Sequence, residues 1–366
     1  MGSKRKRTSK EAVTGTSNQP SNKRPKSAAD PSEAPPTRPE APELIEKSPF
    51  VENPTGDERK REAYLYDFLG SEDVNERINA ADVIVSSLFA EECVPEPILV
   101  RHLEQRLFRG LVSGRKASRL GFSLVITEIL GQLFGEKDLA ASSYPDLSFE
   151  KVLGILLEKT DASGNLPGLA ERDHYYGQLF GIECFVRAGI LFGEKSRWTQ
   201  VLDLLVKMSQ KKVWLRRQCG WIILQAIPHM KRKTAEKVLE KLVEEGLAQT
   251  SEGVAIWLLA VAKFPKLKAP SKPWQDPLMS SSFASLPTIL KDSGRDNTIT
   301  ETPEAQSQKQ NNWTAQLHFV WDYILASFIL RADAAEKETA ELFKQFWTRV
   351  VDGRLSFRSS RVSSSC

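Results

Sequence analysis

Apolar residues recur at three- and four-residue steps through most of the chain after residue 56, which is the spacing of one face of an α-helix. Asp57 and Glu58 mark the first helix start, and Ser71 is placed to cap the second helix. The buried face predicted for the second helix carries Val74, Ile78, Ala81, Val85 and Leu88. Further helices are predicted at residues 99–112, 116–134, 147–158, 171–192, 198–208, 214–227, 234–246 and 253–264. Because no convincing alternation of apolar and polar residues occurs, the pattern predicts an all-α protein.

Pairs of these helices recur at roughly 35–45 residues, which is the period of HEAT and armadillo units. A single helical hairpin cannot bury its apolar face alone, and stacking on its neighbours supplies that burial. We therefore predict a HEAT- or armadillo-like helical-repeat scaffold, with a compact multi-helix domain as the alternative. The helix at 116–134 shows the widest apolar stripe, made of Leu120, Leu124, Ile126, Ile129, Leu130 and Leu133.

Changes in composition divide the chain into five segments. Residues 1–56 form a basic tail rich in Pro and Ser, and residues 57–264 form the helical-repeat domain. Residues 265–311 are predicted to be a loop or linker because helical spacing stops there and Pro and Ser accumulate. Its prolines are Pro270, Pro273, Pro277, Pro287 and Pro303. Residues 312–352 continue the helical repeats, and residues 353–366 are expected to fray.

The charge is unevenly distributed. The net charge is +4, yet residues 1–26 hold eight Lys and Arg against Glu11 alone, so the remainder is slightly acidic. With almost no aromatic residues the tail cannot bury enough surface to fold, and we predict that it is disordered. Its two basic clusters are typical of nuclear localisation signals read by an import receptor, the alternative being a solubilising tail. The clustered residues are Lys4, Arg5, Lys6 and Arg7, followed by Lys23, Arg24 and Lys26.

A second basic segment lies inside the helical region. Residues 203–241 carry ten Lys and Arg against Asp203, Glu236 and Glu240. Such a stripe on a slightly acidic scaffold is suited to a phosphate backbone or another acidic partner, and a solvated helix face is the alternative. The residues proposed for this stripe are Lys207, Lys211, Lys212, Arg216, Arg217, Lys231, Arg232 and Lys233. Aromatic residues are not interleaved as in RNA-binding modules, so base-specific reading is not predicted.

Catalytic chemistry is not indicated. The four Cys and four His are scattered, without the paired spacing of a metal site or redox dithiol. Residues 110–118 resemble a phosphate loop only superficially, because three residues rather than four separate the glycines and a helix precedes them. No apolar run approaches the ~20 residues that span a bilayer. The sequence therefore predicts no metal, cofactor, small-molecule substrate or membrane partner.

Three stretches of the chain resemble one known family. The first, at residues 106–124, includes Arg109, Gly110, Gly114, Arg115, Lys116 and Arg119. The second, at residues 172–192, includes Arg172, His174, Tyr176, Gly177 and Gln178. The third comprises Leu317–Asp322 with Phe346 and Trp347. Together they are similar to the nucleolar DNA polymerase phi family, also called the DNA polymerase V or Myb-binding protein 1a family.

The resemblance implies a non-enzymatic helical-repeat scaffold in the nucleolus, concerned with rRNA gene transcription, rRNA processing and large-subunit assembly. Pre-ribosomal particles, rRNA or rDNA and transcription-related proteins are the implied partners. A DNA-directed DNA polymerase, as the family name suggests, and a generic helical-repeat nuclear adaptor are the alternatives. Family members are usually much longer, and residues 353–366 depart from the family pattern. We therefore expect this chain to be a truncated, fungal-type member that corresponds to the N-terminal portion.

Overall fold

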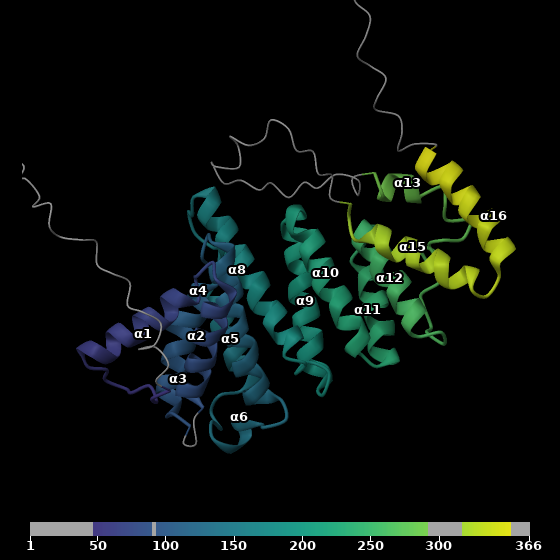
Figure 1. The fold of residues 1–366 in the computed structure, drawn as a ribbon. Helices are drawn as coiled ribbons and strands as arrows, with labels where there is room; N and C mark the ends of the chain where they lie inside the picture. Colours follow the sequence, from purple (N-terminus) through teal and green to yellow (C-terminus); the bar gives the residue numbers. More distant parts are fainter. Residues whose placement is uncertain (1–46, 90–92, 292–316, 353–366) are drawn as a thin grey trace, which may run out of the picture. The chain divides into compact units, whose positions relative to one another are not determined.

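The computed structural model describes residues 47–89, 93–291 and 317–352. Within these ranges the chain is helical and contains no strand, so the all-α prediction is confirmed (Figure 1). The first helices are α1 (Gly56–Phe68), α2 (Val74–Leu88), α3 (Glu96–His102), a π-helical turn (Leu103–Leu107), α4 (Phe108–Gly110) and α5 (Lys116–Phe134). The middle of the chain forms α6 (Leu139–Ser142), α7 (Phe149–Lys159), α8 (Gly168–Arg187), α9 (Lys195–Lys211) and α10 (Arg216–Ala226). The last helices are α11 (Arg232–Glu244), α12 (Ser251–Lys263), α13 (Leu286–Ile289), α15 (Val320–Ala332), α16 (Glu336–Phe346) and a π-helical turn (Trp347–Asp352).

Several helices begin at a side chain that satisfies their free backbone amides. Thr55 and Glu58 form a reciprocal capping box at the start of α1, and Ser148 caps α7. The prediction that Ser71 caps the second helix is wrong, because Asp73 accepts hydrogen bonds from Asn75 and Glu76 instead. The Ser71 hydroxyl accepts a hydrogen bond from the Asp73 amide at 3.1 Å and so supports the cap indirectly.

The principal helices form a series in which each member packs against the next, in the order α2, α5, α8, α10, α12 and α15 (Figure 1). A second set packs against this series, with α1 on α2, α7 on α8, α9 on α10, α11 on α12 and α16 on α15. Contacts near the helix starts show that members of the series run parallel: Arg119 of α5 meets Asp173 of α8, and Glu252 of α12 meets His318 before α15. The N-terminal ends of the series therefore lie along one edge.

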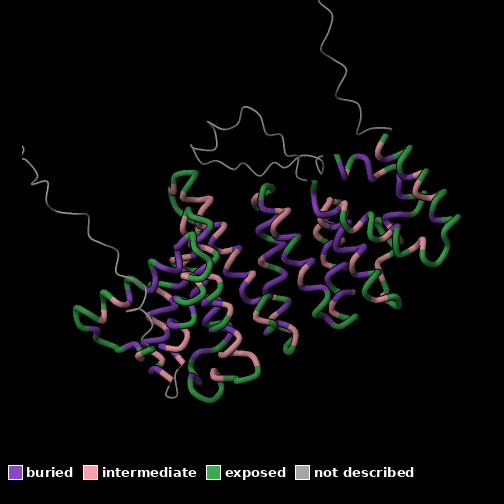
Figure 2. The backbone as a smooth tube through the Cα atoms, viewed as in Figure 1, coloured by how far each residue is buried: buried purple, intermediate pink, exposed green. Residues whose placement is uncertain are grey.

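The core lies between the two sets of helices, where buried residues follow each other from helix to helix (Figure 2). Trp257, Tyr144, Phe108 and Phe185 are its largest fully buried side chains. Each buried side chain of this kind contributes about 1.5–3 kcal/mol to the free energy of folding. At Gly121 an added Cβ would lie 2.0 Å from the carbonyl oxygen of Leu69, so glycine is what allows α5 to approach the end of α1.

Four leucine, isoleucine and valine positions predicted to be buried are exposed. Val74 and Ile78 are 56% and 49% exposed, because α2 packs through Ala80, Ala81, Ile84 and Leu88. Leu120 and Leu124 are also exposed, because the first half of α5 is buried through Ala117, Ser118, Gly121 and Val125 instead. The other four predicted positions on α5 are fully buried, as expected: Ile126, Ile129, Leu130 and Leu133. A broad apolar stripe on a helix does not by itself indicate which of its residues are buried against a neighbouring helix.

Two segments predicted as tail and linker contribute to the core. Phe50, the only aromatic residue in the first 56, is 4% exposed and its ring lies 4.2 Å from that of His102. Residues 265–291 are irregular apart from α13, yet they bury Trp274 against Trp257 and Phe283 against Phe346. Aromatic side chains provide enough buried area to hold these segments without regular helices. The predicted localisation clusters, the rest of the linker and residues 353–366 lie outside the described residues.

None of the helices in the described ranges has the length and apolar character required to cross a membrane.

Candidate nucleic-acid interface

The first two motif stretches and part of the basic segment come together at the edge formed by the parallel helix starts. The turn between α4 and α5 packs on α8 at Gly177, where an added Cβ would lie 3.0 Å from Val112 and 3.1 Å from Leu111. At Gly114 the same turn faces Asp173, whose carboxylate would lie 3.3 Å from an added Cβ. Small residues at both positions therefore bring the turn onto the first half of α8.

Arg119 ties these two elements together. Its guanidinium donates to the Ser113 carbonyl, forms an ion pair with Asp173 at 3.5 Å and lies 5.3 Å from the centre of the Tyr176 ring. Burial lowers the pKa of Arg119, and the neighbouring Asp173 charge opposes that shift. An arginine remains charged in such a setting, so its ion pair with Asp173 helps to hold the turn before α5 against α8.

The other residues of the first motif lie toward solvent. Arg115 donates to the Gly70 carbonyl at 2.5 Å and forms a weaker ion pair with Glu72 at 3.8 Å. Arg109 and Lys116 are exposed. Gly110 has a packing role, because an added Cβ would lie 2.4 Å from the Phe122 ring. The motif therefore combines two glycines that permit close packing with cations that lie at the surface.

Aromatic residues of α8 meet the connection between α9 and α10. Tyr176 lies 5.4 Å from the Arg172 guanidinium and 5.5 Å from the Trp214 ring. Tyr175 lies 6.2 Å from the Trp214 ring, and the ammonium groups of Lys211 and Lys212 lie 5.5 and 5.3 Å from its centre. Trp214 remains 41% exposed. We call this group the basic–aromatic cluster: Arg119, Arg172, Tyr175, Tyr176, Lys211, Lys212 and Trp214.

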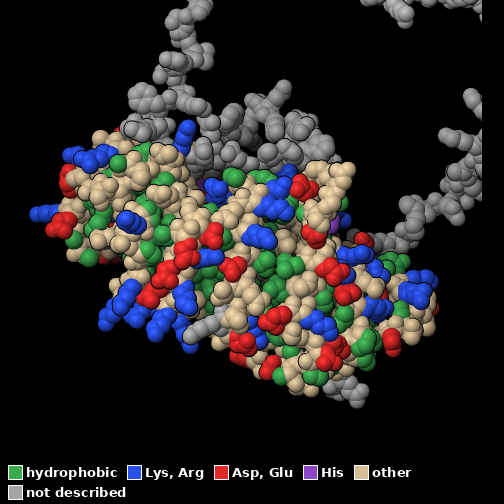
Figure 3. Space-filling model, turned by 180° about the vertical axis from the view of Figure 1, so that it is seen from behind, with side chains coloured by type: hydrophobic (Ala, Val, Ile, Leu, Met, Phe, Trp, Pro, Cys, Tyr) green, Lys and Arg blue, Asp and Glu red, His purple; other side chains and the backbone are tan. Residues whose placement is uncertain are grey.

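The predicted basic stripe is divided between two ends of α10. Lys211, Lys212, Arg216 and Arg217 lie where α9 ends and α10 begins, beside the cluster, and Lys207 lies one turn earlier on α9. The group at residues 231–233 lies where α11 begins, one helix length away. Eleven residues of α10 at ~1.5 Å each separate the two ends by about 17 Å. On the face seen in Figure 3, Lys and Arg are mixed with Asp and Glu over most of the surface, and several Lys and Arg lie together at the lower left. The predicted stripe therefore consists of two groups, one beside the start of α10 and the other after its end.

Some of these cations are neutralised within the protein and others are not. Lys212 pairs with Glu171 at 2.8 Å, and Arg232 pairs with Glu236 at 3.5 Å. Arg217 donates to the Leu317 carbonyl at 3.3 Å. The hydrogen bond with Tyr175 raises the pKa of Lys211. In the described ranges no carboxylate forms an ion pair with five of the lysines: Lys207, Lys211, Lys231, Lys233 and Lys237.

Arg216, His174 and Gln178 contribute less. The Nε atom of Arg216 and the Nδ1 atom of His174 are buried and have no hydrogen-bond partner in the described part of the chain. Gln178 is half-buried on α8. Sequence reasoning missed the aromatic part of the cluster, because Tyr175 and Trp214 are far apart along the chain. The signal that could have found it is the run of cations on both sides of Trp214.

Comparison with known proteins bears directly on these motifs. Residues 102–366, which include the whole cluster, match the family model described as DNA polymerase phi. The chain belongs to the DNA polymerase phi family.

Two curated relatives agree with this assignment. The rDNA transcriptional regulator pol5 of Schizosaccharomyces pombe is 29% identical over 307 residues, covering 80% of this chain and 29% of the relative. The rDNA transcriptional regulator POL5 of Saccharomyces cerevisiae is 25% identical over 346 residues, covering 82% of this chain and 33% of the relative. The chain therefore spans about a third of the length of these relatives. No solved structure matches it.

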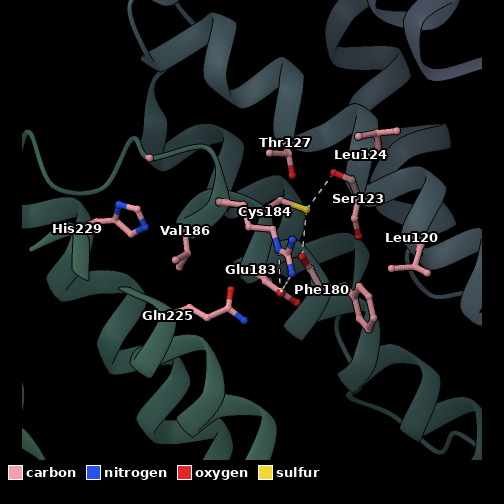
Figure 4. A pocket seen from close by; sticks show the side chains of 12 residues that line it. Leu120, Ser123, Leu124, Thr127, Phe180, Glu183, Cys184, Val186, Gln225 and His229 are labelled. Carbon is pink, nitrogen blue, oxygen red and sulfur yellow. Dashed lines mark hydrogen bonds and ion pairs between the residues drawn. The ribbon is translucent and has the colours of Figure 1, made fainter. Parts of the chain in front are cut away.

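A groove of about 490 Å³ lies further along the same helices of this family member, between α5, α8 and the end of α10. Leu120 and Leu124 line one side, and Gln225 and His229 line the other (Figure 4). At its floor the Cys184 thiol donates to the Phe180 carbonyl at 3.1 Å. Burial raises the pKa of Cys184 to about 11, so the thiol is neutral near pH 7 and is a poor nucleophile.

Two pairs of adjacent acidic residues in the described ranges lie on different helices. Asp57 and Glu58 lie at the start of α1, and Glu244 and Glu245 lie at the end of α11. Glu245 pairs with Lys241 at 3.0 Å, as expected for a solvated helix charge. Within the described ranges, no group of three or more His, Cys, Asp or Glu side chains is placed to hold a metal ion.

Proposed function

We propose that this chain acts in a nuclear and nucleolar regulator of rDNA transcription, as a scaffold rather than as an enzyme. In this proposal the basic–aromatic cluster contacts nucleic acid, either rDNA or rRNA. The observation that carries it is the convergence of two family-motif stretches with half of the basic segment on one surface. The names of both relatives, rDNA transcriptional regulators, support the same role.

The scaffold part of the proposal is a HEAT- or armadillo-like repeat. The parallel series from α2 to α15, with one helix of the second set on most members, is the arrangement that stacked helical hairpins produce. Roles in rRNA processing and large-subunit assembly, with pre-ribosomal particles and transcription-related proteins as partners, belong to the same proposal.

The electrostatic argument rests on unequal neutralisation. A phosphate backbone is attracted to cations that no protein carboxylate neutralises, and within the described ranges Lys211 in the cluster and Lys207 one turn earlier on α9 are two such cations. Asp173 and Glu171 neutralise Arg119 and Lys212, which therefore position the surface more than they attract a ligand. Exposed Lys211 is the residue that we expect to contribute most to phosphate binding.

The test compares two double charge reversals that change the net charge equally. The Lys207→Glu and Lys211→Glu variant changes the end of α9, beside the start of α10. The Lys231→Glu and Lys233→Glu variant changes the start of α11, after the end of α10. Binding of the full chain to labelled rDNA and rRNA fragments is measured by fluorescence anisotropy over a range of salt concentrations. We expect the first variant alone to weaken binding severalfold and to reduce the salt slope by about 0.7–0.9 per lost phosphate contact. Equal losses in both variants, or none in either, would exclude the cluster as the interface.

Nuclear import is tested separately. We propose that an import receptor binds the tail through Lys4–Arg7 and Lys23–Lys26, with no membrane or small-molecule partner involved. A tagged chain with all seven of these basic residues replaced by Ala is expected to remain cytoplasmic while the unaltered chain enters the nucleus. Cytoplasmic retention of the unaltered chain would contradict a nuclear role.

A further inference from the structure

Trp214 is exposed at the centre of the basic–aromatic cluster. It lies in a 3-10 turn, Val213–Leu215, which is fixed by the hydrogen bond from the Leu215 amide to the Lys212 carbonyl at 2.9 Å. Leu215 is fully buried and anchors the turn, whereas Val213 and Trp214 are 64% and 41% exposed. The turn therefore holds a large aromatic ring toward solvent while its neighbour is fixed in the core.

The ring is supported on the protein side. The centre of the Tyr176 ring lies 5.5 Å from it, and the guanidinium groups of Arg119 and Arg172 lie 5.3 and 5.4 Å from the centre of the Tyr176 ring. Arg119 is fixed in turn by Asp173 at 3.5 Å. A ring with so many fixed neighbours loses little further freedom when a ligand stacks on it. Trp214 is therefore a rigid platform rather than a mobile surface side chain.

The charges around the platform indicate what stacks there. Lys211 and Lys212 precede the turn, and their ammonium groups lie 5.5 and 5.3 Å from the centre of the Tyr175 ring, which itself contacts Trp214. A nucleotide chain alternates phosphates with flat bases, so it fits this pattern better than an apolar helix does. An apolar helix carries no anions that could pair with the cations. In a duplex the bases are already stacked on one another, and only unpaired bases present a free face.

We propose that the cluster binds single-stranded nucleic acid, with one unpaired base stacked on Trp214 and adjacent phosphates held by Lys211 and Lys207. This inference rests on the proposed function, since it specifies which form of nucleic acid the same surface takes. An aromatic platform reads a base face rather than a base edge, so binding is tolerant of sequence. Single strands then compete successfully with duplexes of the same length.

The test uses the full chain with Trp214→Leu, Trp214→Phe and a matched control, Trp221→Leu. Trp221 is also on the surface, 40% exposed, but it lies further along α10 and contacts Phe319 at 5.4 Å. The probes are a labelled oligouridylate, a deoxythymidylate of the same length, a mixed-sequence duplex and poly-L-glutamate. We expect Trp214→Leu to weaken single-strand binding about tenfold or more. Duplex binding changes less than about twofold, Trp214→Phe retains most of the affinity, and Trp221→Leu is unchanged.

The outcomes separate this inference from the proposed function. If Trp214→Leu leaves single-strand binding intact while the Lys207 and Lys211 reversal weakens it, stacking is refuted and the electrostatic interface stands. Equal losses for single strands and duplexes also refute stacking. Tighter binding of poly-L-glutamate than of either oligonucleotide identifies an acidic-peptide site and overturns both proposals. Circular dichroism of each variant shows that the helices are retained, and loss of binding in Trp214→Leu that Trp214→Phe restores supports the platform.

Discussion

His102 makes the stability of the N-terminal helices sensitive to mild acid. Its side chain is 1% exposed, and the two ring nitrogens lie 2.6 Å from the Tyr66 hydroxyl and 3.1 Å from the Arg101 guanidinium. Burial, with the nearby charges of Arg101 and Arg106, lowers the pKa of His102 to about 3. The folded protein therefore keeps this ring neutral at pH values where an unfolded chain protonates it.

The direction and the size of the change in the free energy of unfolding follow from this difference in pKa between the folded and unfolded states. Below the unfolded pKa of about 6.5 only the unfolded state takes up the proton, so stability falls as the pH is lowered toward about 3. At pH 5, about 1.5 pH units below the unfolded value, the loss is about 2 kcal/mol at ~1.4 kcal/mol per unit. Above about pH 7.5, a unit above the unfolded pKa, the residue contributes almost no pH dependence.

The assay is urea denaturation followed by circular dichroism at pH 7 and pH 5. His102→Gln has no proton to take up, so its decrease in the free energy of unfolding between these pH values should be smaller by about 2 kcal/mol. At pH 7 the variant is expected to be less stable by about 1–2 kcal/mol, because it loses the ring contact with Phe50. His229→Gln, at an exposed position, is the matched control and should behave like the parent chain. An identical decrease in His102→Gln and the parent would refute the reasoning.

Two further predictions concern packing and thiol reactivity. Gly121→Ala, whose Cβ would lie 2.0 Å from the Leu69 carbonyl oxygen, should lower stability by about 1–3 kcal/mol in thermal melts. Gly131→Ala on the same helix meets nothing within 4 Å and should be neutral or stabilising, so equal melting temperatures would contradict the close approach of α5. Burial raises the pKa of Cys184 to about 11 and that of Cys219 to about 12, so among the three cysteines in the described ranges iodoacetamide at pH 8 should label half-buried Cys93 before the other two, as read by mass spectrometry. Labelling of Cys184 at the rate of Cys93 would show that its site opens readily.

Local patterns predicted the helices well. The helix at 116–134 was placed at the observed bounds, because a long apolar stripe ends there at Gly135 and begins after the Gly114 turn. Contacts between distant residues were not predictable. Trp274 and Phe283 pack on residues 257 and 346, and no periodicity in a proline-rich segment indicates such partners.

The candidate site, too, was only partly predictable from the sequence. The cations at residues 211–217 were recognised from the sequence. They were grouped with residues 231–233, although the length of α10 separates the two groups in the structure. The aromatic platform was missed, because Tyr176 and Trp214 become neighbours only when α8 and α10 pack together. Charge density was therefore readable from the sequence, whereas its combination with aromatic rings required the fold.

The parallel series has a consequence for the cooperativity of the site. The basic–aromatic cluster takes residues from α5, from α8, and from the end of α9 and the turn before α10, and α5, α8 and α10 each contact their neighbours in the series. Fraying that begins at α1 or α16 leaves the cluster intact until it reaches this central stretch. Once the contact between α8 and α10 opens, Tyr176 and Trp214 separate although neither residue has changed. A ligand that spans both helices therefore acts as a clamp on that contact, so occupancy of the surface and resistance to local unfolding rise together.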